Sequence, residues 1–368
     1  MSNRKIRLGI TQGDINGVGY EVILRALSDP RILELFTPVI YGSSRIAEFY
    51  RQGTDIPDLN INSLPTDASD AVDERINLVE VTDPAVKAEP GKETAVSGPA
   101  AYEALRAAVA DLRGGNIDAL VTAPINKHSM QSPDFQFPGH TEYLQAELAD
   151  DDQRALMILC NDDLRVALVT IHTPIAEIPA AITQEAIVEK ITDFNASLTR
   201  DFSLPHPHIA VLALNPHAGD GGLLGSEEES VIAPAIAEAS AKGINCFGPF
   251  ASDGFWGSGQ WRKFDGVLAM YHDQGLAPFK TLAMNSGVNF TAGLDYVRTS
   301  PDHGTGYDIA GTGTADAESM REAMYRAVDI LRSRRFHAQA TRNPLRKQYV
   351  EKNKKDNVVL DLSKSSDE

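Results

Sequence analysis

The sequence predicts an α/β fold in which a largely parallel or mixed β-sheet carries helices on its faces. Two observations lead to this class. Short apolar β-type runs alternate with helix-type segments along most of the chain, as in proteins that are built from βαβ units. The length of 368 residues exceeds what one simple hydrophobic core usually covers, so we expect two α/β lobes.

The elements follow in order from local patterns. Predicted strands are short apolar runs bounded by polar or turn-forming residues: Ile6–Thr11, Val39–Tyr41, Ala119–Thr122, Val166–Ile171, Ile209–Leu214, Gly266–Tyr271 and Val288–Phe290. Predicted helices show apolar residues at helical spacing and fall at Pro99–Leu112, Glu227–Ala241 and Ala317–Arg334. Residues 51–97 are acidic and turn-rich, and no element is predicted there. The tail after Arg342 is charged and poor in large apolar residues, which predicts partial disorder.

Composition and charge exclude several classes of protein. Contents of 42% hydrophobic and 23% charged residues are typical of a soluble globular enzyme. A net charge of −17 argues against nucleic acid or an anionic membrane as partner, because both require a basic surface. The chain has no apolar run of about 18 residues and no signal-peptide core at its N-terminus. Cys160 and Cys246 do not form a disulfide framework, and we expect a cytoplasmic protein.

Three histidines follow apolar β-type runs: His172 in LVTIHTP, His217 in VLALNPHAGDGG and His272 in VLAMYHDQG. Ligands of open α/β sheets bind outside the carboxyl ends of the strands, so these three imidazoles could converge on one metal ion. Nitrogen ligands suit Zn, Co, Ni, Fe or Mn, and three protein ligands leave positions open for a substrate. Each histidine taken alone could merely complete a loop, but their shared position favours a metal site.

The glycine-bearing loops exclude the two commonest nucleotide-binding motifs. After the first strand the chain reads TQGDINGVGYE, where Gly17 and Gly19 are followed by Val22, so the Rossmann fingerprint fails, and no Walker A pattern occurs. The segment His303–Gly313, HGTGYDIAGTG, is dense in glycine, and its backbone N–H groups are expected to be free to approach a ligand closely. A nucleotide-binding loop and plain turns both stay open as explanations.

Cationic and polar anchors lie between the last histidine and that segment. Lys280, Asn289 and Arg298 follow at equal nine-residue intervals. Because Arg binds phosphate through a planar fork and Lys as a point charge, they could form a phosphate pocket, although ordinary surface charge is the alternative. His140 and Thr141 precede an amphipathic helix, and Thr141 is a candidate N-cap beside N–H groups that suit an anion.

Several motifs, taken in order, resemble the 4-hydroxythreonine-4-phosphate dehydrogenase family of vitamin B6 biosynthesis: TQGDINGVGYE, TAPINK, FPGHTEYL, LNPHAGDGGLLGSEE, DGVLAMYHDQGLAPFK and VNFTAGLDYVRTSPDHGTGYDIAGTG. The glycine-dense segment also resembles the nucleotide-binding turn of isocitrate and isopropylmalate dehydrogenases. The chain departs from the family pattern at Gln12, Ile15 and Asn16, where GDPAG is usual, at Tyr20, which replaces a proline, and in IHTPI, which replaces THLPL.

The resemblance implies a two-lobed, non-Rossmann fold like that of isocitrate and isopropylmalate dehydrogenases, with the active site in the cleft between the lobes. Residues 1–127 with 292–345 would form the first lobe. Residues 128–291 would form the second, which carries the metal ligands and the dimer contacts. Residues 346–368 would be a charged tail.

The resemblance also implies roles for individual residues. His172, His217 and His272 match ligands of a divalent metal (zinc, magnesium, cobalt or manganese) in a site completed across a homodimer. The substrate-binding positions match at His140, Thr141, Lys280, Asn289 and Arg298. NAD or NADP is expected at the glycine-dense segment, through Gly304, Thr305, Asp308 and Gly311. The candidate catalytic acid–base groups are Asp253, Asp273 and Lys127.

The expected activity is NAD(P)-dependent oxidation of 4-phosphohydroxy-L-threonine at its 3-hydroxyl. Decarboxylation then gives 3-amino-2-oxopropyl phosphate for pyridoxal 5′-phosphate biosynthesis. A divalent ion would lower the pKa of the 3-hydroxyl, and the cofactor would carry the redox chemistry. One alternative is a paralogous dehydrogenase that acts on 4-phosphoerythronate or 4-phosphothreonate with the same metal and phosphate groups. The other is a non-catalytic metal- and phosphate-binding protein, which the intact histidine triad and glycine-dense segment argue against.

Overall fold

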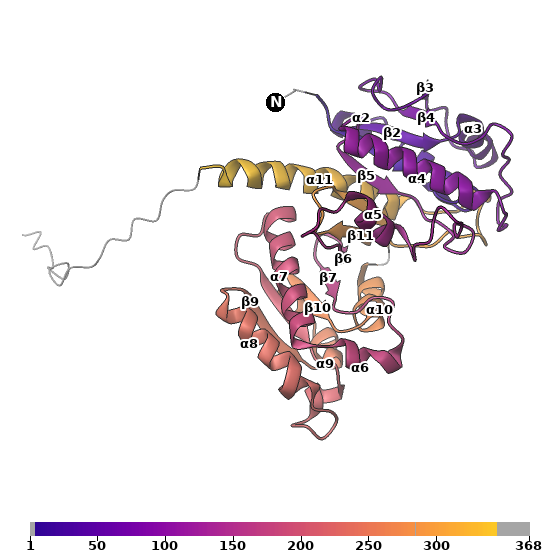
Figure 1. The fold of residues 1–368 in the computed structure, drawn as a ribbon. Coiled ribbons are helices and arrows are strands. Elements are labelled where there is room, and N and C mark those ends of the chain that lie inside the picture. The colour runs from indigo at the N-terminus through magenta and orange to yellow at the C-terminus, as the bar shows by residue number, and fades with distance from the viewer. Residues whose placement is uncertain (1–3, 284, 344–368) are drawn as a thin grey trace, which may run out of the picture.

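The computed structural model describes residues 4–283 and 285–343, which form a twelve-stranded mixed sheet with helices packed on it (Figure 1). The strand order is β3-β4-β2-β1-β5-β12-β11-β6-β7-β10-β8-β9. The strands are β1 Arg7–Thr11, β2 Thr37–Gly42, β3 Asn62–Leu64, β4 Asn77–Glu80, β5 Ala119–Thr122, β6 Leu156–Cys160, β7 Arg165–Leu168, β8 His208–Leu212, β9 Asn245–Phe250, β10 Gly266–Ala269, β11 Val288–Ala292 and β12 Arg298–Pro301. The α-helices are α1 Gly19–Ala26, α2 Ile32–Leu35, α3 Ser44–Gly53, α4 Ser97–Gly114, α5 His140–Leu148, α6 Ile178–Ala181, α7 Gln184–Asp201, α8 Ala233–Ala241, α9 Ser252–Gly257, α10 His272–Ala283 and α11 Glu318–Thr341.

Two parallel halves of the sheet meet at antiparallel strands in its centre. Strands β3, β4, β2, β1, β5 and β12 are parallel to one another, as are β7, β10, β8 and β9. Strand β11 pairs antiparallel with both β12 and β6, and β6 pairs antiparallel with β7. Helix α11 packs on β12, β11 and β5 and also on α7 and α1, so it spans the junction (Figure 1). The predicted α/β class with a mixed sheet is confirmed.

The predicted apolar runs form strands whose side chains are buried in the hydrophobic core. Strands β5 and β10 are buried along their whole length, as expected of parallel strands that are covered on both faces. The largest cluster of buried side chains includes Ile10 of β1, Phe290 of β11 and Val211 of β8, so one hydrophobic core runs through both halves. The predicted division into residues 1–127 with 292–345 and residues 128–291 stays a prediction, because the sheet is continuous across it. The predicted tail, residues 346–368, lies outside the described residues.

All the predicted strands and helices have counterparts; Ala119–Thr122 matches β5 at both ends, and the other predicted elements have at least one shifted end. The predicted helix Glu227–Ala241 is in fact a π-helix, Glu228–Ile232, that continues into α8. Strand β12, of sequence RTSP, has no apolar pattern and forms because β5 and β11 pair with its two edges. Strands β3 and β4, within the acidic residues 51–97, form by parallel pairing outward from β2. No helix within 4–283 and 285–343 combines the length and apolarity needed to cross a membrane.

Candidate active site

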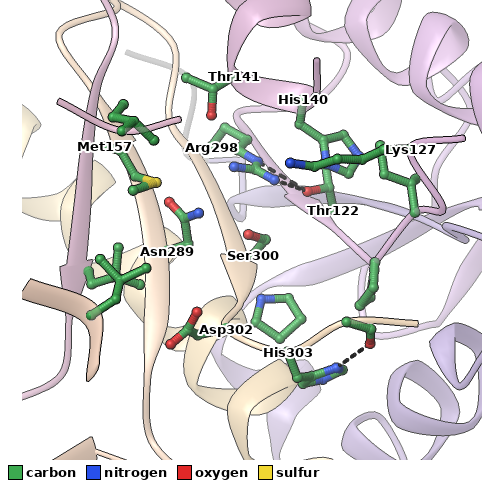
Figure 2. A pocket seen from close by; sticks show the side chains of 18 of the residues that line it. Thr122, Lys127, His140, Thr141, Met157, Asn289, Arg298, Ser300, Asp302 and His303 are labelled. Atoms are coloured by element: carbon green, nitrogen blue, oxygen red, sulfur yellow. Dashed lines mark hydrogen bonds between the residues drawn. The ribbon is translucent and has the colours of Figure 1, made fainter. Parts of the chain in front are cut away.

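A cavity of about 290 Å³ lies where several strands end, next to the antiparallel centre of the sheet (Figure 2). Thr122 ends β5, and Pro301 ends the neighbouring parallel strand β12. Asn289 reaches the same edge because antiparallel pairing sets it opposite Ser300. The polar residues of the lining are Thr122, Lys127, His140, Thr141, Glu142, His172, His272, Lys280, Asn289, Arg298, Ser300, Asp302 and His303. All five predicted substrate-binding residues therefore face one cavity.

Arg298 is the buried cation of this cavity, with a relative exposure of 4%. Its Nε and Nη2 donate to Thr122 Oγ1 at 3.0 and 2.6 Å, and its Nη1 donates to Thr291 Oγ1 at 3.2 Å. No carboxylate in the described part of the chain forms an ion pair with it. Burial lowers the pKa of Arg298 to about 9, which leaves the guanidinium charged at neutral pH. A buried cation that is bonded only to neutral hydroxyls is suited to receive an anion.

His140 and Asn289, both in the cavity lining, each carry an unsatisfied polar atom. Neither His140 Nε2 nor Asn289 Oδ1 has a hydrogen-bond partner among the described residues, although both atoms are buried. Burial, and then the charges of Arg298 and Lys127, hold the pKa of His140 well below its usual range, so its imidazole is neutral. Buried polar atoms without partners are rare in folded proteins and indicate that a ligand supplies the missing bonds.

The helix behind His140 corrects one prediction. Thr141 is not the N-cap of α5, because the helix begins at His140 and extended Gly139 occupies the cap position without a side-chain hydrogen bond. Thr141 instead contributes its side chain to the cavity lining (Figure 2).

Lys280 is held in the cavity by Asp302, a residue that the sequence patterns did not indicate. The Lys280 Nζ atom lies 3.2 Å from Asp302 Oδ1 and donates to the Asp302 backbone carbonyl at 3.4 Å. Burial raises the pKa of Asp302, and the charge of Lys280 partly offsets this effect. One carboxylate oxygen and the backbone carbonyl oxygen of Asp302 thus hold the ammonium group in the cavity lining.

The structure brings two of the three predicted metal ligands together. His172 and His272 line the cavity with ring centroids 6.2 Å apart, and His272 Nδ1 lies 2.7 Å from Asp273 Oδ1. Burial is the main cause that lowers the pKa of His172, so its ring is neutral, as a metal ligand must be. His217 is exposed in the turn after β8 and does not line this cavity. Within the described ranges, one chain does not gather three metal-binding side chains at one point.

Of the three candidate acid–base residues, one lines the cavity and two lie outside its lining. Lys127 lines the cavity, and Figure 2 shows its side chain beside the ring of His140. Asp273 contacts His272, but its side chain is 83% exposed and lies outside the lining. Asp253 is exposed in the first turn of α9, also outside the lining.

The glycine-dense segment starts at the cavity and then packs on the motif that follows β1. Gly304 belongs to the lining. Beyond it, the buried carboxylate of Glu21 accepts hydrogen bonds from Gly311 N and, at 3.1 Å, from Gly313 N. Tyr307 Oη donates to Asp14 Oδ2 at 2.7 Å. The expectation that the N–H groups of this segment are free is therefore wrong at Gly311 and Gly313, because a carboxylate of the same chain already binds them.

The other three predicted cofactor-binding residues, Gly304, Thr305 and Asp308, are not bound by Glu21. The carbonyl of Thr305 accepts from Val18 N at 2.8 Å, so this residue is tied to the motif after β1. Asp308 is exposed, and a Cβ atom added at Gly304 would have no described residue other than its chain neighbours within 4 Å. Gly304, Thr305 and Asp308 thus remain open to a ligand that reaches the outer side of the segment.

Sequence patterns missed Thr122, Ser300, Asp302 and His303. Thr122 ends a strand that was predicted, so the rule that ligands bind at strand ends could have found it. Ser300 belongs to β12, and Asp302 and His303 follow it directly. Because β12 is short and polar, nothing in its sequence marked a strand end there.

Comparison with known proteins gives consistent matches along the chain. The family described as "Pyridoxal phosphate biosynthetic protein PdxA" matches residues 34–327. A 4-hydroxythreonine-4-phosphate dehydrogenase of Bacteroides thetaiotaomicron is 56% identical over 352 residues, which cover 96% of each chain. A relative from Oceanobacillus iheyensis, provisionally named D-threonate 4-phosphate dehydrogenase, is 38% identical over 90% of this chain and 99% of its own length. The crystal structure of 4-hydroxythreonine-4-phosphate dehydrogenase from Klebsiella pneumoniae superposes with a TM-score of 0.77 at 33% identity, covering 90% of this chain and 99% of that one.

Proposed function

This chain belongs to the pyridoxal phosphate biosynthetic protein PdxA family, and on that premise we propose that it oxidises 4-phosphohydroxy-L-threonine with NAD or NADP. Oxidation at the 3-hydroxyl is followed by decarboxylation to 3-amino-2-oxopropyl phosphate. The observation that carries the substrate class is the buried guanidinium of Arg298, which forms no ion pair with a carboxylate of the described residues, in a cavity shared with Lys280 and Asn289. The name of the relative that is 56% identical supports the same activity.

The phosphate group is bound by Arg298, Lys280 and Asn289. Thr122 and Thr291 hold the guanidinium so that its planar fork keeps one orientation, and Asp302 holds the Lys280 ammonium beside it. An entering phosphate would give Arg298 the ion-paired anion that the described part of the chain does not provide. Charge-assisted bonds to Arg are geometrically specific, which orients the rest of the substrate toward His172 and His272.

Lys127 and His140 are placed to handle the reacting end of the substrate. Of the three candidate acid–base residues, Lys127 lines the cavity, and we propose that its Nζ delivers a proton to the substrate carbon from which carbon dioxide has left. Neutral His140, with its unsatisfied Nε2, would hydrogen bond to a polar group of the substrate. Asp273 and Asp253 remain candidates that a second copy of the chain could bring closer.

The residues present fit a divalent ion and a nicotinamide nucleotide. When bound, the ion would lower the pKa of the 3-hydroxyl, and the nicotinamide ring would supply the hydride acceptor for the oxidation at carbon 3. His172 and His272 share one cavity, and the neutral ring of His172 suits a ligand role. We propose that the partner's His217 completes this set in a homodimer. Gly304, Thr305 and Asp308 would contact the nucleotide from the outer side of the glycine-dense segment.

A second candidate substrate class is 4-phosphothreonate or 4-phosphoerythronate. The relative that is 38% identical carries the provisional name D-threonate 4-phosphate dehydrogenase, and this observation favours the alternative. Both substrate classes offer a 4-phosphate and a 3-hydroxyl, so the residues described above would serve either one. They differ at carbon 2, which bears an amino group in one class and a hydroxyl in the other.

The test measures initial rates of NAD(P)H formation with each of the three substrates, with and without a chelator. Chelator-sensitive turnover that prefers 4-phosphohydroxy-L-threonine supports the main proposal, and preference for a sugar acid supports the alternative. His217→Ala should abolish metal-dependent turnover while the protein stays folded. His206→Ala, at an exposed histidine outside the cavity, is the matched control and should keep its activity. Absence of turnover on all three substrates with metal present would overturn both assignments.

A further inference from the structure

The turn that carries His217 has an unusual backbone. His217 (φ 53°, ψ 29°), Ala218 (φ 53°, ψ 42°) and Asp220 (φ 46°, ψ 53°) are all left-handed, and Gly219 between them has φ 80°. Left-handed backbone is unfavourable for residues with a Cβ atom, and consecutive residues keep it only where their surroundings hold them. Something in the structure must therefore fix this turn.

The carboxylate of Glu228 holds the residues that enter this turn, beside the backbone hydrogen bond from Asp220 N to His217 O at 3.2 Å within it. Glu228 is 3% exposed, and its Oε1 accepts hydrogen bonds from Leu214 N at 2.8 Å and Asn215 N at 2.7 Å. Its Oε2 accepts from Asn215 Nδ2 at 3.0 Å and would lie 2.8 Å from a Cβ atom at Gly219. The carboxylate thus binds the residues that enter the turn and packs against the turn itself.

Two further features of Glu228 support a role in holding this turn. It begins the π-helix Glu228–Ile232, an irregular winding that is frequent at functional sites. Within residues 4–283 and 285–343, no Lys, Arg or His forms an ion pair with it, so only N–H groups compensate its buried charge. A buried carboxylate that is satisfied by the N–H groups beside one turn holds that turn in one geometry.

We propose that Glu228 is the positioning residue that presents His217 for metal binding. The inference rests on the proposed function, in which His217 is the third metal ligand. Groups that orient a metal-bound histidine set its affinity, and their loss typically weakens metal binding by roughly 10- to 100-fold. Glu228 acts through the backbone of the turn, whereas such groups more often act through the second ring nitrogen.

The test is a titration of the full-length protein with Co²⁺ alone, followed by the visible d–d absorption of the bound ion. Glu228→Gln places an NH₂ group against the Asn215 amide in place of Oε2, and we expect a Kd for Co²⁺ that is about 10- to 100-fold weaker. Glu229→Gln makes the same change one residue further on, at an exposed side chain, and should bind Co²⁺ as the wild type does. Binding of inorganic phosphate to the cavity of Arg298 should be unchanged in both variants. A purely structural defect would weaken phosphate and Co²⁺ binding together, and that result would overturn the proposal.

His217→Ala separates this proposal from the proposed function. Wild-type Co²⁺ affinity in His217→Ala would refute the metal set itself. Loss of Co²⁺ binding in His217→Ala together with wild-type affinity in Glu228→Gln would refute the positioning role alone. If Glu228→Gln does not fold, Asn215→Ala removes the amide contacts while the carboxylate keeps its bonds to the two backbone N–H groups. That variant should bind Co²⁺ several-fold more weakly, and unchanged affinity would overturn the proposal.

Discussion

Replacing Arg298 by methionine should stabilise the ligand-free protein and strongly reduce its activity. Arg298 is buried without a carboxylate partner in the described structure, so its charge is retained at a cost to folding. Methionine has a similar length and no charge, and it would fill the same space beside Thr122 and Thr291. The expected gain in the free energy of unfolding thus measures the stability that the fold loses by keeping a buried cation for anion binding.

The magnitude follows from the pKa of Arg298, which burial brings from 12.5 to about 9. At about 1.36 kcal/mol for each tenfold change in acidity, keeping the guanidinium charged in the cavity costs about 5 kcal/mol. Methionine would leave the hydroxyls of Thr122 and Thr291 without their donor, at a cost of roughly 1–3 kcal/mol. The net expectation is a free energy of unfolding that is higher by about 2–4 kcal/mol. Loss of two charge-assisted bonds to phosphate, each worth roughly 1.5–3 kcal/mol, should lower kcat/KM by about 10²- to 10⁴-fold.

Urea unfolding of the ligand-free protein and steady-state kinetics measure the two effects. Arg334→Met is the matched control, because Arg334 Nε lies 2.7 Å from Oδ1 of Asp201, whose side chain is fully buried. There the same substitution removes one partner of a buried ion pair and should destabilise the protein by up to about 3–5 kcal/mol, since Arg200 still pairs with Asp201. An Arg298→Met protein that is less stable than the wild type, or that keeps its kcat/KM, would show that this reasoning is wrong.

Two further predictions concern His140 and Glu21. The folded-state pKa of His140 lies well below its unfolded value near 6.5, so its contribution to stability is complete above pH 6.5 and is lost as the pH falls through the folded pKa. Urea unfolding between pH 7.5 and 5 should show a decline of up to about 1.4 kcal/mol per pH unit from this group, and that component should be missing in His140→Asn. Glu21→Gln replaces one oxygen that accepts from Gly311 or Gly313 by an NH₂ group, which should lower the free energy of unfolding by roughly 1–3 kcal/mol and weaken NAD(P) binding. Phosphate affinity should stay unchanged in Glu21→Gln, and equal loss of both ligands would argue against a specific role in holding the glycine-dense segment.

Much of the cavity could be predicted because its residues sit next to regular elements. Thr122 ends β5 and His272 lies shortly after the end of β10, and such parallel strands expose their carboxyl ends along one edge of the sheet. The resemblance added His140 and Arg298, whose own surroundings carry no such periodic signal. Asp302 was missed because the strand before it, β12, is polar and gains its place from β5 and β11 rather than from its own propensity.

By itself, the sequence determined the α/β class, the alternation of elements and the strand-end positions of the three histidines, because these depend on the periodicity of neighbouring residues. Only the tertiary structure decided which hydrogen-bond partners the buried charged side chains have. The guanidinium of Arg298 meets Thr122 across 176 positions of chain, and Glu21 meets Gly311 across 290. Contacts between such distant segments leave no local pattern, since each side chain finds its partner only after the sheet has brought the strands together. For the same reason, the separation of His217 from His172 and His272 within one chain became visible only in the fold.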